Sequence, residues 1–541
     1  MKTYKIIALS FIFGSTSFGQ TLNEAIKKTE NERFDLAGSD FRTLITKEPT
    51  RGDYYFYAGD NYCQHEDMDS ANIMWKKGTE IDPVNALNYV GLGKYLWFNG
   101  DTTNAKININ KALTSTKNKN AEIIRQIASI YIETPKFKKL DAAIALLDKA
   151  IKLDPKSAET YLILGDALQE KTPENGSAAI KNYNLALELN PKSPKAIVRT
   201  AKLYQRAKNY ELANSKYKEA QVLDPTYAPA YRANAELNMK FDQSSKAIEN
   251  WKKYLALNNS TDARYRYATS LFSGKKYCEA INELNTVQTN GFNNLYVERM
   301  LTYSYFECEN NEENANYTKG IETSEKFFQL APADKILASD YKYKGFLLSK
   351  LGKDSLAIIE LERACTIDST KVPELLGEVG KLHMKNKKYI EAIEAYERKR
   401  NGEYSNLNVQ ELNELGRAYY SGTKDYAMAD TCYAELISRS PTYAPAYLWR
   451  ARSNYNQNSK NEKWLAQSFY EKYLELLTPN ELISVNNKSY VIEASKYLGD
   501  YYVNSKENKD LVKAKTYWEI VRKTDPTDKQ AAAFFASPAG K

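Results

Sequence analysis

The chain has 541 residues, of which 43% are hydrophobic and 27% charged, and its formal net charge is +8. This is the composition of an ordinary soluble protein. So modest a positive charge on so long a chain argues against a dedicated nucleic-acid binder, which concentrates basic residues on one face. The 42 tyrosines are the unusual feature, and they suit both a fold that reuses aromatic positions and a surface that binds other molecules.

Residues 1–19 have the three parts of a secretory signal peptide. A basic start precedes a short apolar segment, residues 6–13, and Ser17 and Gly19 then place small residues before a cut at Gln20. The apolar segment is too short to span a bilayer. We therefore predict an exported protein that has no membrane span and is periplasmic or associated with the outer membrane.

After this segment, small and aromatic residues recur about every 34 positions. The interval is clearest in residues 194–261, where one set of anchors is repeated in the next unit: Ile197, Ala201, Ala213 and Tyr217, then Tyr231, Ala235, Ala247 and Trp251. Small residues at the paired positions let two helices approach closely, and a proline near position 32 ends the second helix. A period of this length with these anchors predicts helix–turn–helix units.

About fourteen such units follow one another along the chain. We expect them at 21–51, 52–85, 86–119, 120–157, 158–193, two within 194–261, then 261–292, 293–333, three between 334 and 443, 444–477 and 491–527. They form an N-terminal array, 20–292, in which the register loosens after residue 261, and a C-terminal array, 334–528.

Two segments depart from the regular arrays. Residues 293–333 form an irregular repeat with an Asn/Glu-rich turn at 309–316, and we expect this repeat to be a hinge or a seam between domains. Residues 529–541 form a short tail in which Phe534 and Phe535 are expected to cap the open end of the last repeat.

On these anchors the chain resembles the tetratricopeptide repeat (TPR) family. The heptapeptide PTYAPAY occurs at 225–231 and again at 441–447, each time at a junction between units. The resemblance implies an all-α fold, an α-solenoid of about fourteen TPR units that forms a right-handed superhelix, with the first helix of each unit lining a concave groove. It also implies a non-catalytic role in binding or scaffolding proteins.

The five cysteines are scattered along the chain and form no C-x-x-C pair: Cys63, Cys278, Cys308, Cys365 and Cys432. Zinc sites and disulfide scaffolds need closer, paired spacing, so we favour buried thiols on helices. A bridge between Cys278 and Cys308 stays open, because export permits disulfides. The first cysteine lies far from the predicted cut, so a lipoprotein is not expected.

The sequence lacks the residues of a catalytic site. Its two histidines, His65 and His383, lie several repeats apart, and a solenoid does not bring such distant units together. His65 stands beside acidic residues in what we expect to be a solvated turn, and His383 is expected to pack between helices. Neither a P-loop nor a G-x-S-x-G motif occurs. We predict no enzyme activity, no cofactor and no metal site.

Helical periodicity places positions near 2, 5, 9 and 12 of each unit on the groove side. In the central units this predicts a mainly basic, partner-binding wall of Lys195, Lys202, Arg206, Arg232 and Arg266, with Gln205 and Glu236 beside it, whereas early units offer Asp53, Asp60 and Asp166. Such a wall would attract acidic segments of partner proteins, because arginine can hold a carboxylate with two hydrogen bonds. The alternative is that these are solvated charges on a water-filled groove.

Two functional hypotheses follow. The first is a non-catalytic protein–protein interaction scaffold of the bacterial cell envelope, placed by analogy with exported family members in a secretion, motility or outer-membrane assembly machine. The second is a periplasmic carrier or sensor whose groove holds a peptide or glycan, for which Trp97 is expected at an inward position beside Phe98. Some family members clamp a terminal carboxylate with Lys and Asn four residues apart. Val198 and Lys202 replace that pair here, so no such clamp is expected.

Overall fold

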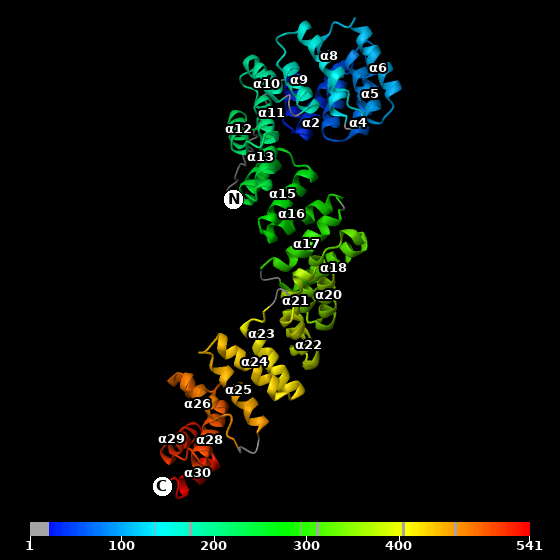
Figure 1. Cartoon of the computed structure of the whole chain (residues 1–541). Helices are drawn as coiled ribbons and strands as arrows, with labels where there is room; N and C mark the ends of the chain where they lie inside the picture. Colours follow the sequence, from blue (N-terminus) through cyan, green and yellow to red (C-terminus); the bar gives the residue numbers. More distant parts are fainter. Residues whose placement is uncertain are drawn as a thin grey trace, which may run out of the picture. The chain divides into compact units, whose positions relative to one another are not determined.

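The computed structural model describes residues 21–134, 136–172, 176–292, 294–309, 313–402, 406–458 and 463–540. These residues form thirty α-helices and no β-strand (Figure 1). Consecutive helices pack in pairs from α1 with α2 to α25 with α26, and α28 packs with α29, which makes fourteen helix–turn–helix units in the described part of the chain. The predicted all-α solenoid of about fourteen units is confirmed. The predicted signal segment lies outside the described residues.

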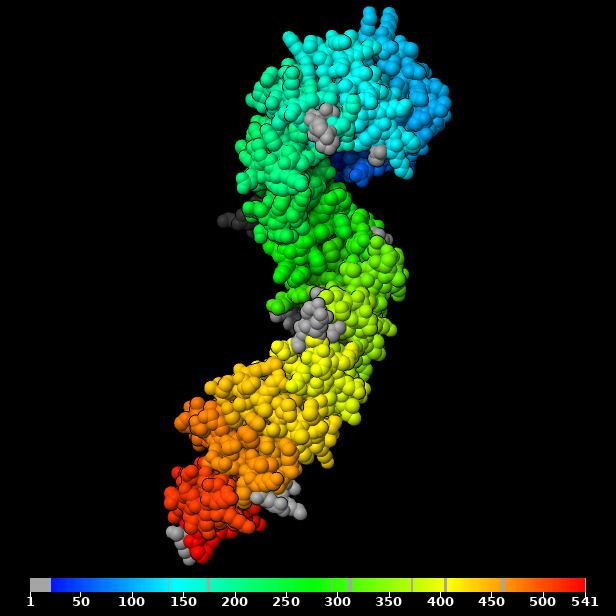
Figure 2. All heavy atoms as spheres, in the orientation of Figure 1, coloured from blue at the N-terminus to red at the C-terminus, as the bar shows by residue number. Residues whose placement is uncertain are grey.

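The chain divides into two compact units, Met1–Asn293 (unit 1) and Asn294–Lys541 (unit 2). Unit 1 contains α1(Leu22–Glu30), α2(Phe34–Lys47), α3(Gly52–Gln64), α4(Met68–Ile81), α5(Ala86–Phe98), α6(Thr102–Ser115), α7(Ala121–Glu133), α8(Leu140–Leu153), α9(Ala158–Lys171), α10(Gly176–Leu189), α11(Pro194–Arg206), α12(Tyr210–Leu223), α13(Ala228–Lys240), α14(Ser244–Leu257), α15(Thr261–Ser273) and α16(Tyr277–Thr289). Within it, each pair of helices packs on the next in chain order, and the colours of Figure 2 accordingly run in sequence order over its surface.

Unit 2 contains α17(Leu295–Glu307), α18(Glu313–Leu330), α19(Ala338–Lys350), α20(Asp354–Ile367), α21(Val372–Lys385), α22(Tyr389–Arg400), α23(Val409–Ala418), α24(Tyr426–Arg439), α25(Ala444–Gln457), α26(Gln467–Leu476), α27(Pro479–Leu482), α28(Lys488–Asn504), α29(Leu511–Thr524) and α30(Lys529–Ala536). Short 3₁₀ turns, Ala333–Lys335 and Ser369–Lys371, and a π-helical turn, Tyr419–Thr423, interrupt the pairs. The small helix α27 was not predicted.

The ends of the helices follow from local residues. Helix α11 illustrates a start: Ser193 accepts a hydrogen bond from the backbone N–H of Ala196, and Pro194 occupies the first turn, where its missing N–H costs nothing. In many repeats a left-handed residue then reverses the chain after the first helix; Glu32 does so with φ of 54°. The turn after α1 therefore has the same backbone conformation as the turns of many other repeats.

Small residues let the two helices of a pair meet, as predicted. The ring of Trp75 on α4 lies so close to Gly59 on α3 that a β-carbon there would be 2.4 Å from the indole nitrogen. Tyr183 on α10 covers Gly165 on α9 in the same way, again at 2.4 Å. Trp75 and Tyr183 are both fully buried, so each of these two pairs of helices is held by a large aromatic side chain that packs on a glycine.

The irregular repeat differs in part from its prediction. The turn expected at 309–316 is shorter, because α18 already begins at Glu313 and the Asn316 side chain is buried; residues 310–312 lie outside the described part. At the far end of unit 2, Phe534 of α30 stacks on Trp518 with ring centroids 5.6 Å apart. None of the described helices is both long and apolar enough to cross a membrane.

The cysteines correct one expectation. Cys63, Cys365 and Cys432 are free thiols, and the last two are buried. Cys278 of unit 1 and Cys308 of unit 2 are each disulfide-bonded rather than free.

Candidate functional site

Two adjoining cavities lie in unit 1. The larger, of about 730 Å³, is lined mainly by residues of α9, α11 and α13, together with Glu30 at the end of α1 and Glu32 in the turn after it. The smaller, of about 580 Å³, lies among α1, α3, α5, α7 and α9. Most of these are first helices of their repeats, so the helices that were expected to line the groove do so. We call the larger cavity the central cavity.

Charged side chains dominate the wall of the central cavity. Seven are cationic and five acidic, which leaves a formal excess of two positive charges: Lys195, Arg199, Lys202, Arg206, Lys208, Arg232 and Lys240 against Glu30, Glu32, Asp166, Glu170 and Glu236. A wall of this balance favours an anionic ligand.

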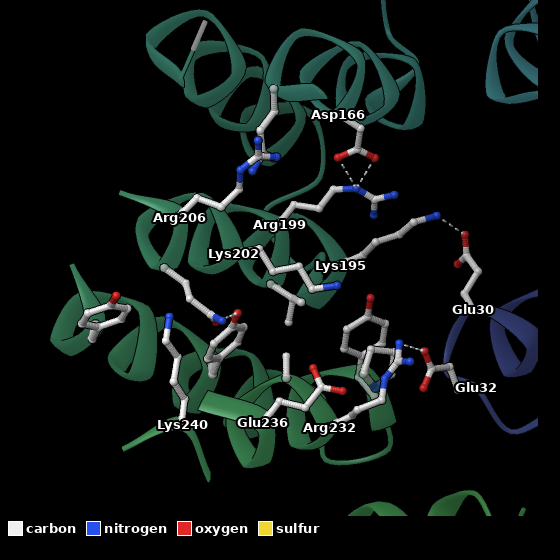
Figure 3. A pocket seen from close by; sticks show the side chains of 18 of the residues that line it. Glu30, Glu32, Asp166, Lys195, Arg199, Lys202, Arg206, Arg232, Glu236 and Lys240 are labelled. Carbon is white, nitrogen blue, oxygen red and sulfur yellow. Dashed lines mark hydrogen bonds and ion pairs between the residues drawn. The ribbon is translucent and has the colours of Figure 1, made fainter. Parts of the chain in front are cut away.

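Four of the five predicted wall residues come together here. Lys195, Lys202 and Arg206 lie on one face of α11, and Arg232 faces them from α13 (Figure 3). The fifth, Arg266 on α15, does not line the central cavity and instead donates to Asp262 at 2.8 Å.

Sequence reasoning missed Arg199, which the same helical face includes. Its Nε donates to both carboxylate oxygens of Asp166, at 2.9 and 2.7 Å, and Tyr183 donates to that carboxylate at 2.8 Å. Asp166 was assigned to an acidic region of the early units, yet it lies in the wall of the central cavity. The spacing of Lys195, Arg199 and Lys202 at i, i+4 and i+7 was a signal that could have found it.

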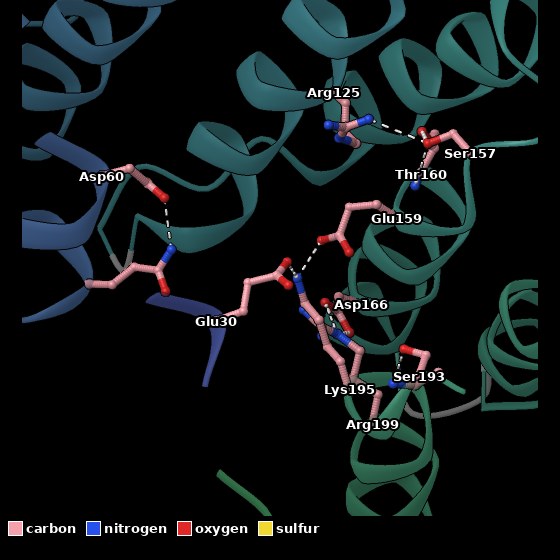
Figure 4. A network of polar contacts seen from close by, with 12 residues as sticks. Glu30, Asp60, Arg125, Ser157, Glu159, Thr160, Asp166, Ser193, Lys195 and Arg199 are labelled. Atoms are coloured by element: carbon pink, nitrogen blue, oxygen red, sulfur yellow. Dashed lines mark hydrogen bonds and ion pairs between the residues drawn. The ribbon is translucent and has the colours of Figure 1, made fainter. Parts of the chain in front are cut away.

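Lys195 joins three helices. Its ammonium donates to Glu159 of α9 at 2.7 Å and to Glu30 of α1 at 3.0 Å (Figure 4). Burial alone would raise the pKa of Glu159, but the charges of Lys195 and Arg199 outweigh it and lower that pKa to about 2. Glu159 is therefore ionised over the whole physiological range. Lys195 and Glu30 also line the smaller cavity, so their ion pair stands where the two cavities meet.

The turn that follows α1 reaches the same wall. The guanidinium of Arg232 and the hydroxyl of Tyr254, at 2.8 Å, both donate to the Glu32 carboxylate. Asn31 donates to the Thr226 hydroxyl at 3.0 Å. The first repeat of unit 1 is thus held against its sixth and seventh repeats. No signal in the sequence pointed to this, because the partners lie about 200 residues apart along the chain.

Lys202 differs from its neighbours on α11. It forms no ion pair with any residue that the structure describes, and its side chain extends into the space between α11 and α13 (Figure 3). It is accessible to solvent although protein surrounds it. Burial, and then the charges of Arg232 and Arg199, lower its pKa. An anion beside Lys202 would relieve this repulsion.

The smaller cavity contains a paired lysine. Lys94 lies 3.0 Å from Glu133 and 3.6 Å from Asp60. Burial acts to lower the pKa of Lys94, but Glu133 and the groups near it raise the pKa well above its usual value. Lys94 is therefore a neutralised cation and offers less to a ligand than Lys202.

Trp97 does not offer the exposed aromatic surface that was expected to bind a glycan or peptide. Its side chain is fully buried, packs on Tyr131 with ring centroids 4.8 Å apart, and donates to the Phe137 carbonyl at 3.2 Å. The prediction that it faces the groove is wrong, because residues 136–139 fold over it. The neighbouring Phe98 does line the smaller cavity.

The histidines occupy ordinary structural positions. His65 stacks on Phe34, with ring centroids 4.9 Å apart, and burial lowers the pKa of His383. Among the residues that can be described, no group of three or more His, Cys, Asp or Glu side chains could hold a metal ion.

Comparison with known proteins identifies relatives of this chain. A family model described as TPR repeat matches residues 138–171, which include α8 and α9. The C-terminal part of a TPR repeat-containing protein from Cytophaga hutchinsonii is 30% identical over 50% of this chain and 98% of its own length, with a TM-score of 0.40. The pilF protein of Pseudomonas aeruginosa is 22% identical over 40% and 94% (TM-score 0.28), and a tetratricopeptide repeat protein from Parabacteroides merdae is 19% identical over 49% and 98% (TM-score 0.29).

Proposed function

Because the chain belongs to the tetratricopeptide repeat family, we propose that it is a non-catalytic protein-binding scaffold of the bacterial cell envelope. In this proposal it takes acidic segments of partner proteins into the central cavity of unit 1. The repeats themselves suggest a protein–protein interaction scaffold; the acidic ligand and the envelope location are the finer parts of the proposal.

Lys202 is the observation that carries the acidic ligand. It forms no ion pair with a described residue, and burial followed by the charges of Arg232 and Arg199 lowers its pKa more than Glu236 and Glu32 raise it. A carboxylate of a partner would complete the charge balance of the wall. A cavity of about 730 Å³ lies within the range of protein ligand sites, about 300–1,000 Å³.

Binding of an acidic segment at Lys202 can be tested by fluorescence anisotropy with a labelled peptide of alternating glutamate and glycine. We expect it to bind the full chain, and Lys202→Gln to weaken binding about tenfold, the effect of losing one charge-assisted hydrogen bond. Lys218→Gln is the matched control, because Lys218 is exposed on α12 and does not line the cavity. Equal binding by both variants, or no binding of the acidic peptide by the wild type, would remove the acidic ligand from the proposal.

The envelope location rests on residues 1–19. Their basic start, apolar segment and small residues before Gln20 are those of an export signal. Cell fractionation should find the chain in the periplasm or with the outer membrane, and mass spectrometry should find a mature end near Gln20. A chain without residues 1–19 should stay in the cytoplasm; retention of the whole chain there would contradict the proposal.

The alternative, a carrier or sensor for a peptide or glycan, has lost its main support. This alternative needs Trp97 as a surface on which a ligand stacks, but the Trp97 side chain is fully buried. Three tyrosines line the central cavity: Tyr217 and Tyr227 are buried, and the partly exposed Tyr210 packs against Phe241. A neutral glycan that displaced the acidic peptide would restore this alternative.

A further inference from the structure

The turn after α1 fills part of the cationic wall with carboxylates from this chain. Glu30 accepts from Lys195 of α11, and Glu32 accepts from Arg232 of α13 (Figure 3). Between them, Asn31 is buried and donates to Thr226. Three consecutive residues therefore contact two successive repeats at once.

This contact is wholly polar, whereas α1 packs on α2 and α3 through an apolar cluster as well as through the hydrogen bonds of Lys28 and Thr29. The apolar side of α1, with Ala25 and Ile26, packs in one cluster with Phe41 and Tyr54 of the next two helices. The side that faces α11 and α13 is held by hydrogen bonds and ion pairs. Pairs of this kind, partly open to water, contribute little each and weaken with salt. The first repeat can thus stay folded on α2 and α3 while its outer contact opens.

We propose that the turn Glu30–Asn31–Glu32 is a built-in ligand of the central cavity. It occupies the place that an acidic segment of a partner protein takes, and the partner displaces it. This inference rests on the proposed function and deepens it, because the turn shows the chemistry that the site accepts. The predicted partner segment carries two carboxylates separated by one residue, at a turn or at the end of a helix.

Displacement follows from competition for the same cations. The turn is tethered beside its site, so its effective concentration there is about millimolar. A free acidic segment must exceed this competition before it contacts Lys195 and Arg232. With the turn removed from the site, Arg232 loses its paired carboxylate and Lys195 keeps only that of Glu159, so both cations attract an acidic segment more strongly. The turn therefore lowers the affinity of the resting chain for acidic segments and increases its preference for segments that carry two carboxylates.

A peptide with the sequence of residues 21–34, labelled for anisotropy, is the direct probe. We expect it to bind the full-length variant Glu30→Gln/Glu32→Gln about tenfold more tightly than the wild type. The control Glu80→Gln/Glu249→Gln removes the same charge from exposed positions outside the cavity and should bind like the wild type. A peptide with glutamine at the two positions of Glu30 and Glu32 should bind neither protein.

The outcomes separate this inference from the proposed function. Equal affinity of wild type and Glu30→Gln/Glu32→Gln for the peptide would overturn the built-in ligand and leave an acidic-segment site standing. If neither the peptide of residues 21–34 nor the glutamate–glycine peptide bound either protein, the inference and the proposed function would both be overturned. If sedimentation showed a wild-type dimer that the double substitution dissociates, the turn would act between two copies and the intramolecular device would be wrong.

One measurement needs no substitution. Saturating peptide should raise hydrogen exchange at the backbone amides of residues 31–33 in the wild type, while the amides of α2 stay protected. Unchanged exchange at 31–33 in the peptide complex would show that the turn is not displaced and would overturn the inference.

Discussion

Both units are built from the same kind of helix pair, but they differ in the sequence separation between the residues whose side chains contact one another. In unit 1, Glu32 contacts Arg232 and Tyr254, 200 and 222 residues later. In the described part of unit 2, the ion pairs between repeats join adjacent ones, as Arg299 with Asp340 does over 41 residues. Repeats that contact only their neighbours respond locally to a perturbation. Unit 1 adds a contact between its first and seventh repeats, which we call closure, and the residues that make it, Glu32 and Arg232, line the central cavity.

Loss of a core aromatic should give the largest effect and expose the difference between the units. Trp75 of unit 1 and Trp518 of unit 2 are buried and lie on glycines of the partner helix. Replacing either by alanine should cost about 3–5 kcal/mol of unfolding free energy. Hydrogen exchange should show that Trp75→Ala also loosens α11 and α13, whereas Trp518→Ala affects α28–α30 alone. Equally local losses would mean that closure transmits nothing.

An ion pair in each unit gives the next effect. Arg299 and Asp340 are 13% and 2% exposed and meet at 2.7 Å, so Arg299→Ala leaves a buried carboxylate without its cation and should cost about 3 kcal/mol. Arg232 is 37% exposed, so Arg232→Ala should cost about 1 kcal/mol. Urea unfolding followed separately in each unit would check the order. A larger cost for Arg232→Ala would make closure a major source of stability.

Acid should affect unit 1 through Glu159. Lys195 and Arg199 outweigh burial and hold its folded pKa near 2, below the usual 4.5, so its stabilisation is present above about pH 4.5 and is lost as the pH falls toward 2. The shift corresponds to about 3 kcal/mol. Because the side chain is 32% exposed, we expect about half of that. Glu159→Gln should flatten the stability of unit 1 between these pH values; an unchanged acid slope would count against the ion pair.

The sequence predicted the repeats well because each depends on local contacts. Gly59 faces Trp75 within one unit, and a small residue opposite an aromatic one at a fixed spacing is visible in a single period. Lys195, Lys202 and Arg206 line one cavity because they share one face of a single helix, which helical periodicity makes visible.

The rest of the site depends on distances that no local pattern encodes. Glu30 meets Lys195 only because small rotations add up over five repeats, so its role was missed. Trp97 was placed in the groove by its position in the unit, but an insertion in the next repeat covers it, and its Nε1 bonds to Phe137. The first failure comes from the accumulated rotation between repeats, and the second from an insertion in a single repeat.

The smallest predicted effect decides what kind of closure unit 1 has. Lys27 of α1 also reaches the distant wall, 3.4 Å from Asp224, but it is 65% exposed. Lys27→Gln should therefore change the unfolding free energy by less than about 0.5 kcal/mol and should leave exchange at residues 31–33 unchanged. If it opened the turn as much as Glu32→Gln does, closure would be a diffuse attraction between charged surfaces. If only the glutamates matter, unit 1 differs from unit 2 through one specific contact, which a partner of the right chemistry can replace.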